Sequence, residues 1–250
     1  MRWSARGRGT IWAAALGVAA GPGDLVLSLG TSGTAFTVSD RPSADSTGTV
    51  AGFADATGSF LPLVCTLNAT KVTDATARLL GVDLIQFDQL ALSAHSGGVV
   101  VLPHFDGERT PNRPGAAGSI SGLRPTTVPA QVARAAVEGV VCNLLAGADS
   151  LPATDGRVLL VGGGAHSRAY RQVVADLTGR PVTAVVAEEL VARGAAVQAA
   201  AVLGPRSIAE VAASWDLGDT VTAEPDPAVD GEAIRQEYAA AVEAAGEGAS

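Results

Sequence analysis

Hydrophobic residues along this chain form two kinds of pattern, short apolar runs and longer amphipathic stretches. The short runs are bounded by glycine, proline or polar residues, which is typical of buried strands. The clearest pair is Asp24–Leu29 and Thr34–Val38, which flank a turn of small residues. We expect further strands in the segments 49–56, 59–64, 98–105, 157–161 and 180–186.

The longer stretches have helical spacing and recognisable ends. Gly81 is a stop signal for a helix from Thr66, and Thr126 is a candidate N-cap for a helix reaching Leu151, with Pro129 in its first turn. The small residues of segment 190–204 predict a helix that packs closely against its neighbour. We expect other helices at 12–21, 86–93, 167–179 and 230–245. Hairpin-like strands followed by alternating strands and helices indicate an α/β fold.

Composition narrows the class of protein. Of the 250 residues 47% are hydrophobic, and the formal net charge is -8 with a pI near 4.8. An acidic chain argues against nucleic acid or an anionic membrane as the main partner. Cys65 and Cys142 each lie in an apolar run without a second cysteine at ligand spacing, so we expect buried free thiols, no metal site and a reducing, cytoplasmic location.

The N-terminus leaves two interpretations open. Basic residues, an apolar run and then small residues could form a signal peptide. A first core helix ended by the Gly21-Pro22-Gly23 segment is the interpretation we favour, because the chain continues directly into a glycine turn. No run reaches the roughly 20 apolar residues that a membrane span needs.

The turn Gly30-Thr31-Ser32-Gly33 lies between two predicted strands. Successive backbone N–H groups in such a turn can form an anion-binding nest, and glycine lets the backbone approach a phosphate. An ordinary hairpin turn is the alternative, and the turn alone favours it.

A second glycine turn favours the anion-binding interpretation over the ordinary hairpin turn. Gly162, Gly163 and Gly164 follow an apolar strand, and Ser167 opens a helix, which is a geometry that binds phosphates or nucleotides. The pattern G-x-G-x-x-S is one residue away from a dinucleotide-binding fingerprint, and Glu188 lies about where a ribose-binding acid is expected. A dinucleotide-binding module is therefore one alternative. No Walker A pattern occurs in the chain.

Several blocks in a fixed order carry a more specific resemblance. They read GPGDLVLSLGTSG, LPLVCTLNAT, GERTPNRPGAAGSISGL, ARAAVEGVV, VGGGAHSRAYRQVVADLTGRPV and EELVARGAAVQAAA. From about Ala13 to the end, the chain resembles the C-terminal half of an FGGY-family carbohydrate kinase, and most of all a bacterial xylulose kinase. The resemblance implies an RNase H-like, actin-like ATPase domain of the α/β class.

The resemblance also implies a reaction and a set of binding residues. FGGY kinases transfer the γ-phosphoryl group of ATP to a sugar hydroxyl with Mg²⁺, in a cleft between two such domains. By this resemblance Gly30, Thr31, Ser32 and Gly33 form the phosphate loop. The residues expected along the adenosine or near the nucleotide are Gly163, Gly164, Ser167 and Asn68. Phosphoryl transfer depends mainly on positioning and charge neutralisation, which backbone donors and Mg²⁺ supply.

The catalytic residue of the family has no counterpart here. Its Asp precedes the helix that matches AAALG and takes the proton from the sugar hydroxyl. Thr10 occupies that position, in the segment Thr10-Ile11-Trp12. Codons GAC AAT ATG G for Asp-Asn-Met, read one nucleotide later, encode Thr-Ile-Trp. We therefore hypothesise that residues 1–12 are an atypical, out-of-frame leader, which sequencing of the upstream gene tests.

The expected organisation is a leader at 1–12, a nucleotide-binding domain at 13–215 and an acidic tail with a terminal helix at 216–250. We predict a xylulokinase-type fragment that binds adenine nucleotide but is inactive alone, because the sugar requires the N-terminal domain. Homodimerisation through the face where that domain docks is a further expectation. The alternatives are a kinase fragment for another sugar or polyol, and a non-catalytic module that binds nucleotide or a partner.

Other charged residues receive structural interpretations. We expect Glu108 and Arg109 to staple a loop, and the alternating polar side chains of His104, Asp106 and Glu108 to be exposed rather than metal ligands. Glu138 interrupts the apolar face of a helix, so we expect a buried, paired carboxylate and not a general base.

Overall fold

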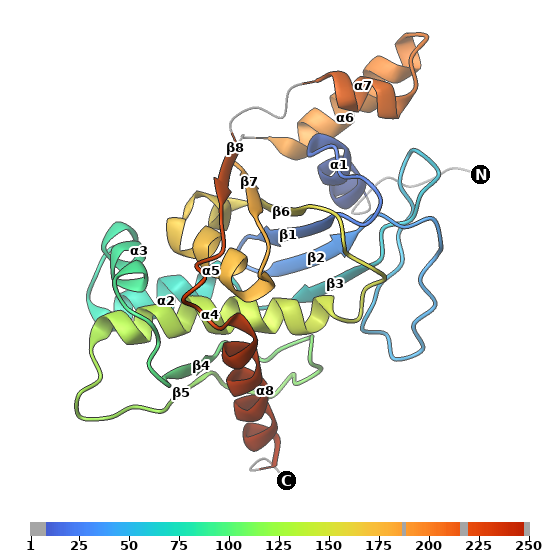
Figure 1. Ribbon diagram of the computed structural model, residues 1–250. Coiled ribbons are helices and arrows are strands. Elements are labelled where there is room, and N and C mark those ends of the chain that lie inside the picture. The colour runs from blue at the N-terminus through green and yellow to red at the C-terminus, as the bar shows by residue number, and fades with distance from the viewer. Residues whose placement is uncertain (1–8, 187–188, 216–219, 248–250) are drawn as a thin grey trace.

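A computed structural model describes residues 9–186, 189–215 and 220–247 (Figure 1). Its centre is a six-stranded sheet in the order β3-β2-β1-β6-β7-β8, and β4 and β5 form a separate pair. The strands are β1 Leu25–Leu29, β2 Gly33–Thr37, β3 Leu63–Thr66, β4 Val100–Leu102, β5 Ser119–Ser121, β6 Val158–Val161, β7 Val182–Val185 and β8 Thr220–Ala223. The helices are α1 Gly9–Gly17, α2 Thr70–Leu80, α3 Leu84–Ser93, α4 Pro129–Ala148, α5 Arg168–Thr178, α6 Leu190–Leu203, α7 Ile208–Ser214 and α8 Gly231–Glu247.

The strand directions confirm the expected fold class. β1 and β2 form an antiparallel hairpin, and β2 also pairs antiparallel with β3. β1, β6 and β7 are parallel, with Leu27 opposite Leu160 and Leu160 opposite Ala184. Among β3, β2, β1, β6 and β7, β2 alone runs antiparallel to the others, which is the arrangement of the RNase H-like, actin-like ATPase fold. β8 pairs antiparallel with β7 at the edge of the sheet. This arrangement differs from the wholly parallel start of a dinucleotide-binding sheet.

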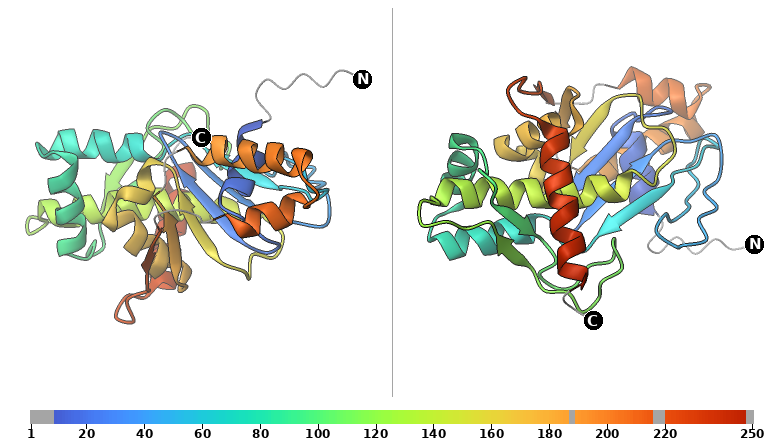
Figure 2. Two further views of the ribbon diagram at one scale, coloured as in Figure 1. Left: turned by 90° about the horizontal axis from the view of Figure 1, so that it is seen from above. Right: turned by 60° about the horizontal axis from the view of Figure 1, so that its bottom comes forward.

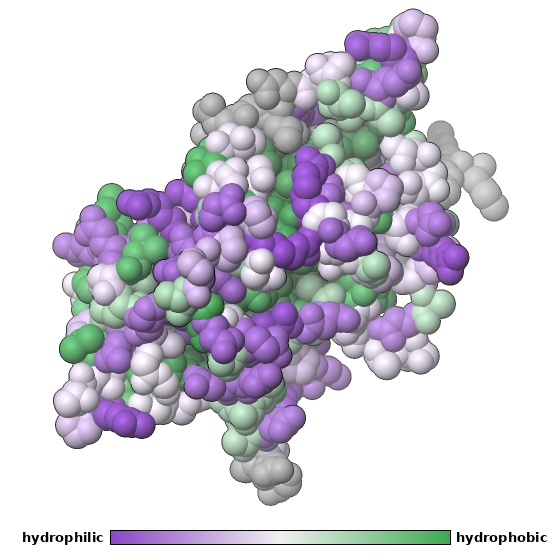
Figure 3. All heavy atoms as spheres, in the orientation of Figure 1, coloured by the Kyte–Doolittle hydropathy of each residue, from purple (hydrophilic) through white to green (hydrophobic). Residues whose placement is uncertain are grey.

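The larger core lies on the face of the sheet covered by α4. Nearly every residue of α4 from Val132 to Ala148 is buried, and α2, α3 and α5 pack around it. Figure 2 shows α8 crossing beside α4, and Tyr238 of α8 is buried in the same core. Hydrophilic side chains are spread over the face of the molecule that carries α8 (Figure 3).

On the opposite face, α1 and α6 pack closely against each other, as the small residues of α6 predicted. A Cβ at Gly194 would collide with the carbonyl of Ala13, and one at Gly17 would collide with the carbonyl of Leu190. Glycine is therefore required at both positions for the two helices to approach. Beneath them lies a second core cluster formed by side chains from α1, β1, β2 and β6.

Some predicted elements differ from the structure. The helices predicted at 12–21 and from Thr66 are α1 Gly9–Gly17 and α2 Thr70–Leu80. The region 216–250, predicted as an acidic tail with a terminal helix, contains that helix as α8, which packs into the core, and also contributes β8 to the edge of the sheet. Thr126 is not the N-cap of α4, because Val128 precedes the helix and its N–H donates to Gln131 Oε1 over 3.0 Å. The segment 49–56 contains isolated bridges instead of a strand. Both cysteines are free; Cys142 is buried and Cys65 is half-buried.

Candidate functional site: a pocket between two glycine turns

A pocket of about 610 Å³ lies where β1 and β6 end, on the side of the sheet that carries α1 and α6. Both predicted turns reach it, the first through Gly30, Thr31 and Ser32, and the second through Gly162 and His166. The remaining lining residues are Ile11, Ala14, Ser28, Thr34, Phe36, Val161, Val185, Glu189, Leu190 and Val191. Two turns 130 residues apart in sequence therefore line one cavity.

The first turn links β1 to β2 and leaves its polar groups open to the pocket. Thr31 and Ser32 are exposed, and the N–H of Gly30 donates to the carbonyl of Ser32 over 3.0 Å. Among the residues that the structure describes, the N–H groups of Thr31 and Ser32 find no backbone acceptor. Adjacent unpaired N–H groups are the donor set of an anion-binding nest.

The start of α2 fixes the orientation of this turn. The N–H of Ala69 donates to the carbonyl of Thr31 over 3.0 Å, and both the N–H and the hydroxyl of Thr70 donate to the carbonyl of Gly30 over 2.9 Å. In a trans peptide the N–H points opposite to the carbonyl. Holding these two carbonyls toward α2 therefore directs the N–H groups of Thr31 and Ser32 away from it.

The second turn connects β6 to α5. Gly162 has φ +85°, where a side chain is strained, and a Cβ there would lie 2.8 Å from the carbonyl oxygen of Leu29. Gly163–His166 forms a short 3₁₀ helix, and Ser167 then caps α5 by accepting the N–H of Tyr170 over 3.1 Å. The turn thus packs directly on the last residue of β1, beside Gly30.

The structure separates the predicted site residues into groups. Gly30, Thr31 and Ser32 line the pocket, whereas Gly33 is the first residue of β2. The lining of the second turn is Gly162 and His166, which flank the predicted Gly163 and Gly164. Ser167 is further along, where its hydroxyl contacts Asp88 of α3.

Asn68 lies behind the first turn, next to α2. It is buried, and its Nδ2 donates to the carbonyl of Gly107 over 2.7 Å and to Glu108 Oε2 over 3.0 Å. Asn68 is therefore not among the described residues that line the pocket, and its side chain contacts Glu108 instead.

The helical wall of the pocket includes residues that the sequence patterns did not single out. Ile11 lines the pocket from the first turn of α1, which begins at Gly9, so position 10 lies in the first turn of a helix that borders the site. Glu189 precedes α6 with φ 59°, a conformation that is strained for a residue other than glycine. The predicted ribose-binding Glu188 and residues 1–8 of the predicted leader lie outside the described residues.

The environment of Glu108 differs from the predicted arginine staple. Its carboxylate is only 1% exposed, and it accepts hydrogen bonds from backbone N–H groups and side-chain amides. His104 is also buried, so the expected exposure is wrong for both His104 and Glu108, whereas Asp106 is exposed as expected and pairs with Lys71 over 2.8 Å. Burial lowers the pKa of His104, although its contact with Asn143 and the charge of Glu108 act in the opposite direction.

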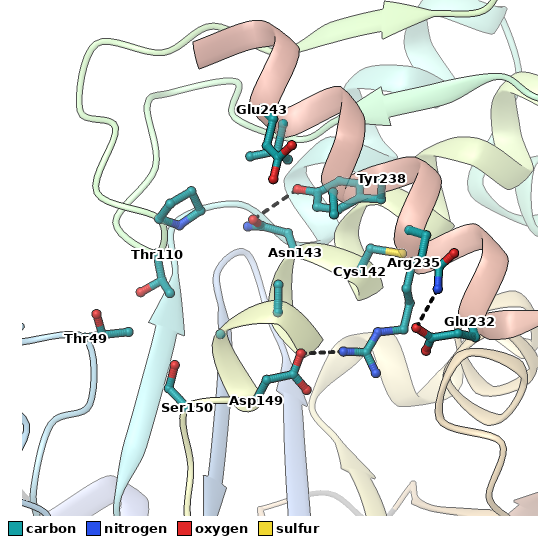
Figure 4. A pocket seen from close by; sticks show the side chains of 16 residues that line it. Thr49, Thr110, Cys142, Asn143, Asp149, Ser150, Glu232, Arg235, Tyr238 and Glu243 are labelled. Atoms are coloured by element: carbon teal, nitrogen blue, oxygen red, sulfur yellow. Dashed lines mark hydrogen bonds and ion pairs between the residues drawn. The ribbon is translucent and has the colours of Figure 1, made fainter. Parts of the chain in front are cut away.

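A second pocket of about 560 Å³ lies between α4, α8 and the loop at Thr110 (Figure 4). Figure 4 shows Tyr238 directed at Asn143 and Arg235 directed at Asp149, with contacts of 3.1 Å and 2.5 Å. Asn143 Nδ2 also donates to Glu108 Oε2 over 3.0 Å, so one residue of this pocket contacts the buried Glu108 carboxylate.

The described ranges contain neither a metal-binding cluster nor a membrane-spanning helix. No group of three or more His, Cys, Asp or Glu side chains there is placed to hold a metal ion. None of the described helices combines the length and hydrophobicity needed to cross a bilayer.

Residues 25–203 match the model for the FGGY family of carbohydrate kinases, C-terminal domain. The chain belongs to this family. Membership confirms the resemblance seen in the sequence, and it excludes the dinucleotide-binding alternative for the second glycine turn.

Known FGGY proteins place the chain more closely. It is 48% identical over 216 residues to a xylulose kinase of Streptomyces coelicolor, which covers 85% of this chain and 44% of the relative. It is 36% identical over 141 residues to a glycerol kinase of Delftia acidovorans, covering 52% of this chain and 28% of the relative. The crystal structure of xylulose kinase from Bifidobacterium adolescentis superimposes with a TM-score of 0.79 at 41% identity, covering 93% of this chain and 46% of that one. The chain thus spans less than half the length of these relatives.

Proposed function

We propose that this FGGY domain binds adenine nucleotide in the pocket between its glycine turns and is the nucleotide-binding part of an ATP-dependent sugar kinase of the xylulokinase type. The observation that carries the proposal is the meeting of both turns at one cavity. Its volume falls within the range of about 300–1,000 Å³ that is usual for small-molecule sites.

The donor chemistry of the pocket fits a nucleoside phosphate. The N–H groups of Thr31 and Ser32, together with the hydroxyls of Ser28 and Thr34 in the pocket wall, would hold phosphate oxygens. The second turn, from Gly162 to Ser167, would lie along the adenosine. Backbone donors held by the fold stabilise developing charge without reorganisation during phosphoryl transfer.

Magnesium enters this proposal with the nucleotide. The described lining of the pocket contains one carboxylate, that of Glu189. Mg²⁺ keeps several waters and is commonly held by one or two carboxylates together with substrate phosphates. In this site the phosphates would supply most of the ligands of Mg²⁺ other than water, and the metal would neutralise the charge of the phosphates.

The transfer step requires a base, which the family places at the start of the helix corresponding to α1. At the start of α1 the family base is replaced by Thr10, whose hydroxyl is not a general base near neutral pH. We therefore propose that the 250-residue chain binds ADP and ATP without phosphorylating xylulose. Sugar binding would require the other domain of the kinase, and the choice between xylulose and another polyol would lie there. Cytoplasmic location and homodimerisation stay predictions.

Calorimetric titration of the purified chain with Mg-ADP tests nucleotide binding. Gly163→Asp is the informative variant, because a Cβ at Gly163 meets nothing within 4 Å, whereas one at Gly164 would lie 2.6 Å from Leu29 Cβ and would disturb the fold. The added side chain would enter the space proposed for the adenosine, and its charge would also oppose that of the phosphates, so we expect at least about a tenfold rise in Kd.

Gly115→Asp is the matched control, because it adds the same charge at another open, exposed glycine outside the pocket. It should leave the Kd for Mg-ADP unchanged, and NAD should not bind. A folded wild-type chain that fails to bind Mg-ADP, or binding that both aspartate variants weaken equally, would overturn the proposed function.

A further inference from the structure

Glu108 lies at the centre of a cluster behind the first glycine turn, outside the pocket lining. Its Oε1 accepts the N–H of Leu67 over 2.5 Å and the N–H of Arg109 over 2.8 Å. Its Oε2 accepts the side-chain amides of Asn68 and Asn143, each over 3.0 Å. This buried carboxylate thus has four donors, and none of them is a cation.

Two of these donors come from the segment that leads into α2. Leu67 and Asn68 directly precede Ala69 and Thr70, whose N–H groups hold the carbonyls of the glycine turn. Asn68 Oδ1 is buried without a hydrogen-bond partner among the described residues, which leaves the donors on Nδ2 to set the orientation of that amide. A buried unpaired acceptor is costly, so the contacts of Nδ2 with Glu108 and Gly107 outweigh its loss.

We propose that Glu108 is a positioning residue for the nucleotide. Its carboxylate fixes residues 67–68, which places the N–H groups of Ala69 and Thr70 on the carbonyls of Thr31 and Gly30. The turn then presents its own N–H groups to the phosphates. This role rests on the proposed nucleotide site, but the position of the turn does not depend on bound nucleotide and can be measured without it.

Glu108→Gln is the direct test. A glutamine retains one acceptor but places an NH₂ group among donors that all need an acceptor. Glu138→Gln is the matched control, because Glu138 is another buried glutamate, and its partner is Arg134 within α4 rather than a residue next to the turn. Hydrogen exchange of the Ala69 and Thr70 amides, followed by NMR without nucleotide, reports the position of the turn.

We expect Glu108→Gln to speed exchange of these two amides about tenfold relative to those of α5, and to raise the Kd for Mg-ADP by a similar factor. Glu138→Gln should leave both quantities unchanged even where it lowers the melting temperature. Should Glu108→Gln fail to fold, Asn68→Ala removes one of the four donors and should give the same changes at smaller size.

Unchanged exchange in a folded Glu108 or Asn68 variant would overturn the positioning role, as would equal changes in the Glu138 control. If the wild-type chain binds no Mg-ADP, the proposed function fails separately, and the exchange measurement still decides whether Glu108 holds the turn.

Discussion

Glu108 and Glu138 are both buried glutamates, at 1% and 4% exposure, but their hydrogen-bond partners differ in charge. Glu138 contacts Arg134 Nε over 2.6 Å, and the same guanidinium donates to Asp176 of α5 over 2.8 Å. Burial acts to lower the pKa of Arg134, but these carboxylates outweigh it and raise the pKa above its ordinary value. Among the described residues, the hydrogen-bond donors to Glu108 are two backbone N–H groups and two side-chain amides.

The two glutamates therefore have different roles, one in the stability of the fold and one in the geometry of the site. The Arg134 cluster is defined as Arg134, Glu138 and Asp176. Its ion pairs join α4 to α5 within the core, so it contributes to the packing of these two helices. The Glu108 cluster, defined as Glu108, Asn68 and Asn143, orders backbone next to the glycine turn. Damage to the first should therefore cost mainly free energy of unfolding, and damage to the second should also cost nucleotide affinity.

The largest effect on stability should come from Arg134→Met. It leaves the carboxylates of Glu138 and Asp176 buried without their cation, and breaking a buried ion pair costs about 3–5 kcal/mol. Urea unfolding monitored by circular dichroism measures this loss. The Kd for Mg-ADP of the folded fraction should not change, and a weakened affinity would contradict the separation of the two clusters.

Asn143→Ala should have an intermediate effect. It removes a donor to Glu108 and the acceptor of the Tyr238 hydroxyl, and it leaves both partners buried. Each unsatisfied group costs about 1–3 kcal/mol. Thermal unfolding gives the stability change, and a titration with Mg-ADP should show weaker binding because Glu108 loses one of its donors. Equal affinity would show that this donor does not contribute to the turn.

Tyr238→Phe is a smaller perturbation of the same cluster. It deletes only the hydroxyl that donates to Asn143 Oδ1 over 3.1 Å and keeps the ring in the core. The expected loss is about 0.5–1.5 kcal/mol in urea unfolding. Affinity for Mg-ADP should hold, since Asn143 still donates to Glu108; a loss as large as that of Asn143→Ala would contradict this order.

The smallest effect concerns pH. Burial lowers the pKa of His104 below its ordinary value of 6.5, so near and below that pH the unfolded chain binds more protons than the folded one. Stability should therefore fall as the pH falls from about 7.5 to about 5.5, by at most about 1.4 kcal/mol over this whole range for one proton. His104→Gln should flatten this part of the urea-unfolding profile. An unaltered pH profile in the variant would exclude His104 as its origin.

Local signals predicted much of the fold. Gly81 ends α2 in the left-handed conformation and Ser167 caps α5, as their sequence contexts indicated, because such signals act within one helical turn. The strand β8 escaped prediction, since Thr220–Ala223 is short, mostly exposed and lacks an apolar run. Its place is set by pairing with β7 and not by its own sequence.

The candidate site was predictable to a similar extent. The glycine turns are local patterns, and both reach one pocket in the structure, whereas their contact with a nucleotide stays a prediction. The surroundings of Glu108 are set by partners 35 to 41 residues away, so no spacing rule revealed that it is buried against amides instead of an arginine. The choice of Gly162 over Gly163 as a lining residue likewise depends on how the second turn packs against Leu29.

The central claim is that one adenine nucleotide contacts both glycine turns. NMR titration of the ¹⁵N-labelled chain with Mg-ADP tests it most directly. We predict that the amide signals of Thr31, Ser32, Gly163 and Gly164 shift together with a single Kd. Shifts confined to one turn, shifts at the two turns with different Kd values, or no shifts at either would contradict the account.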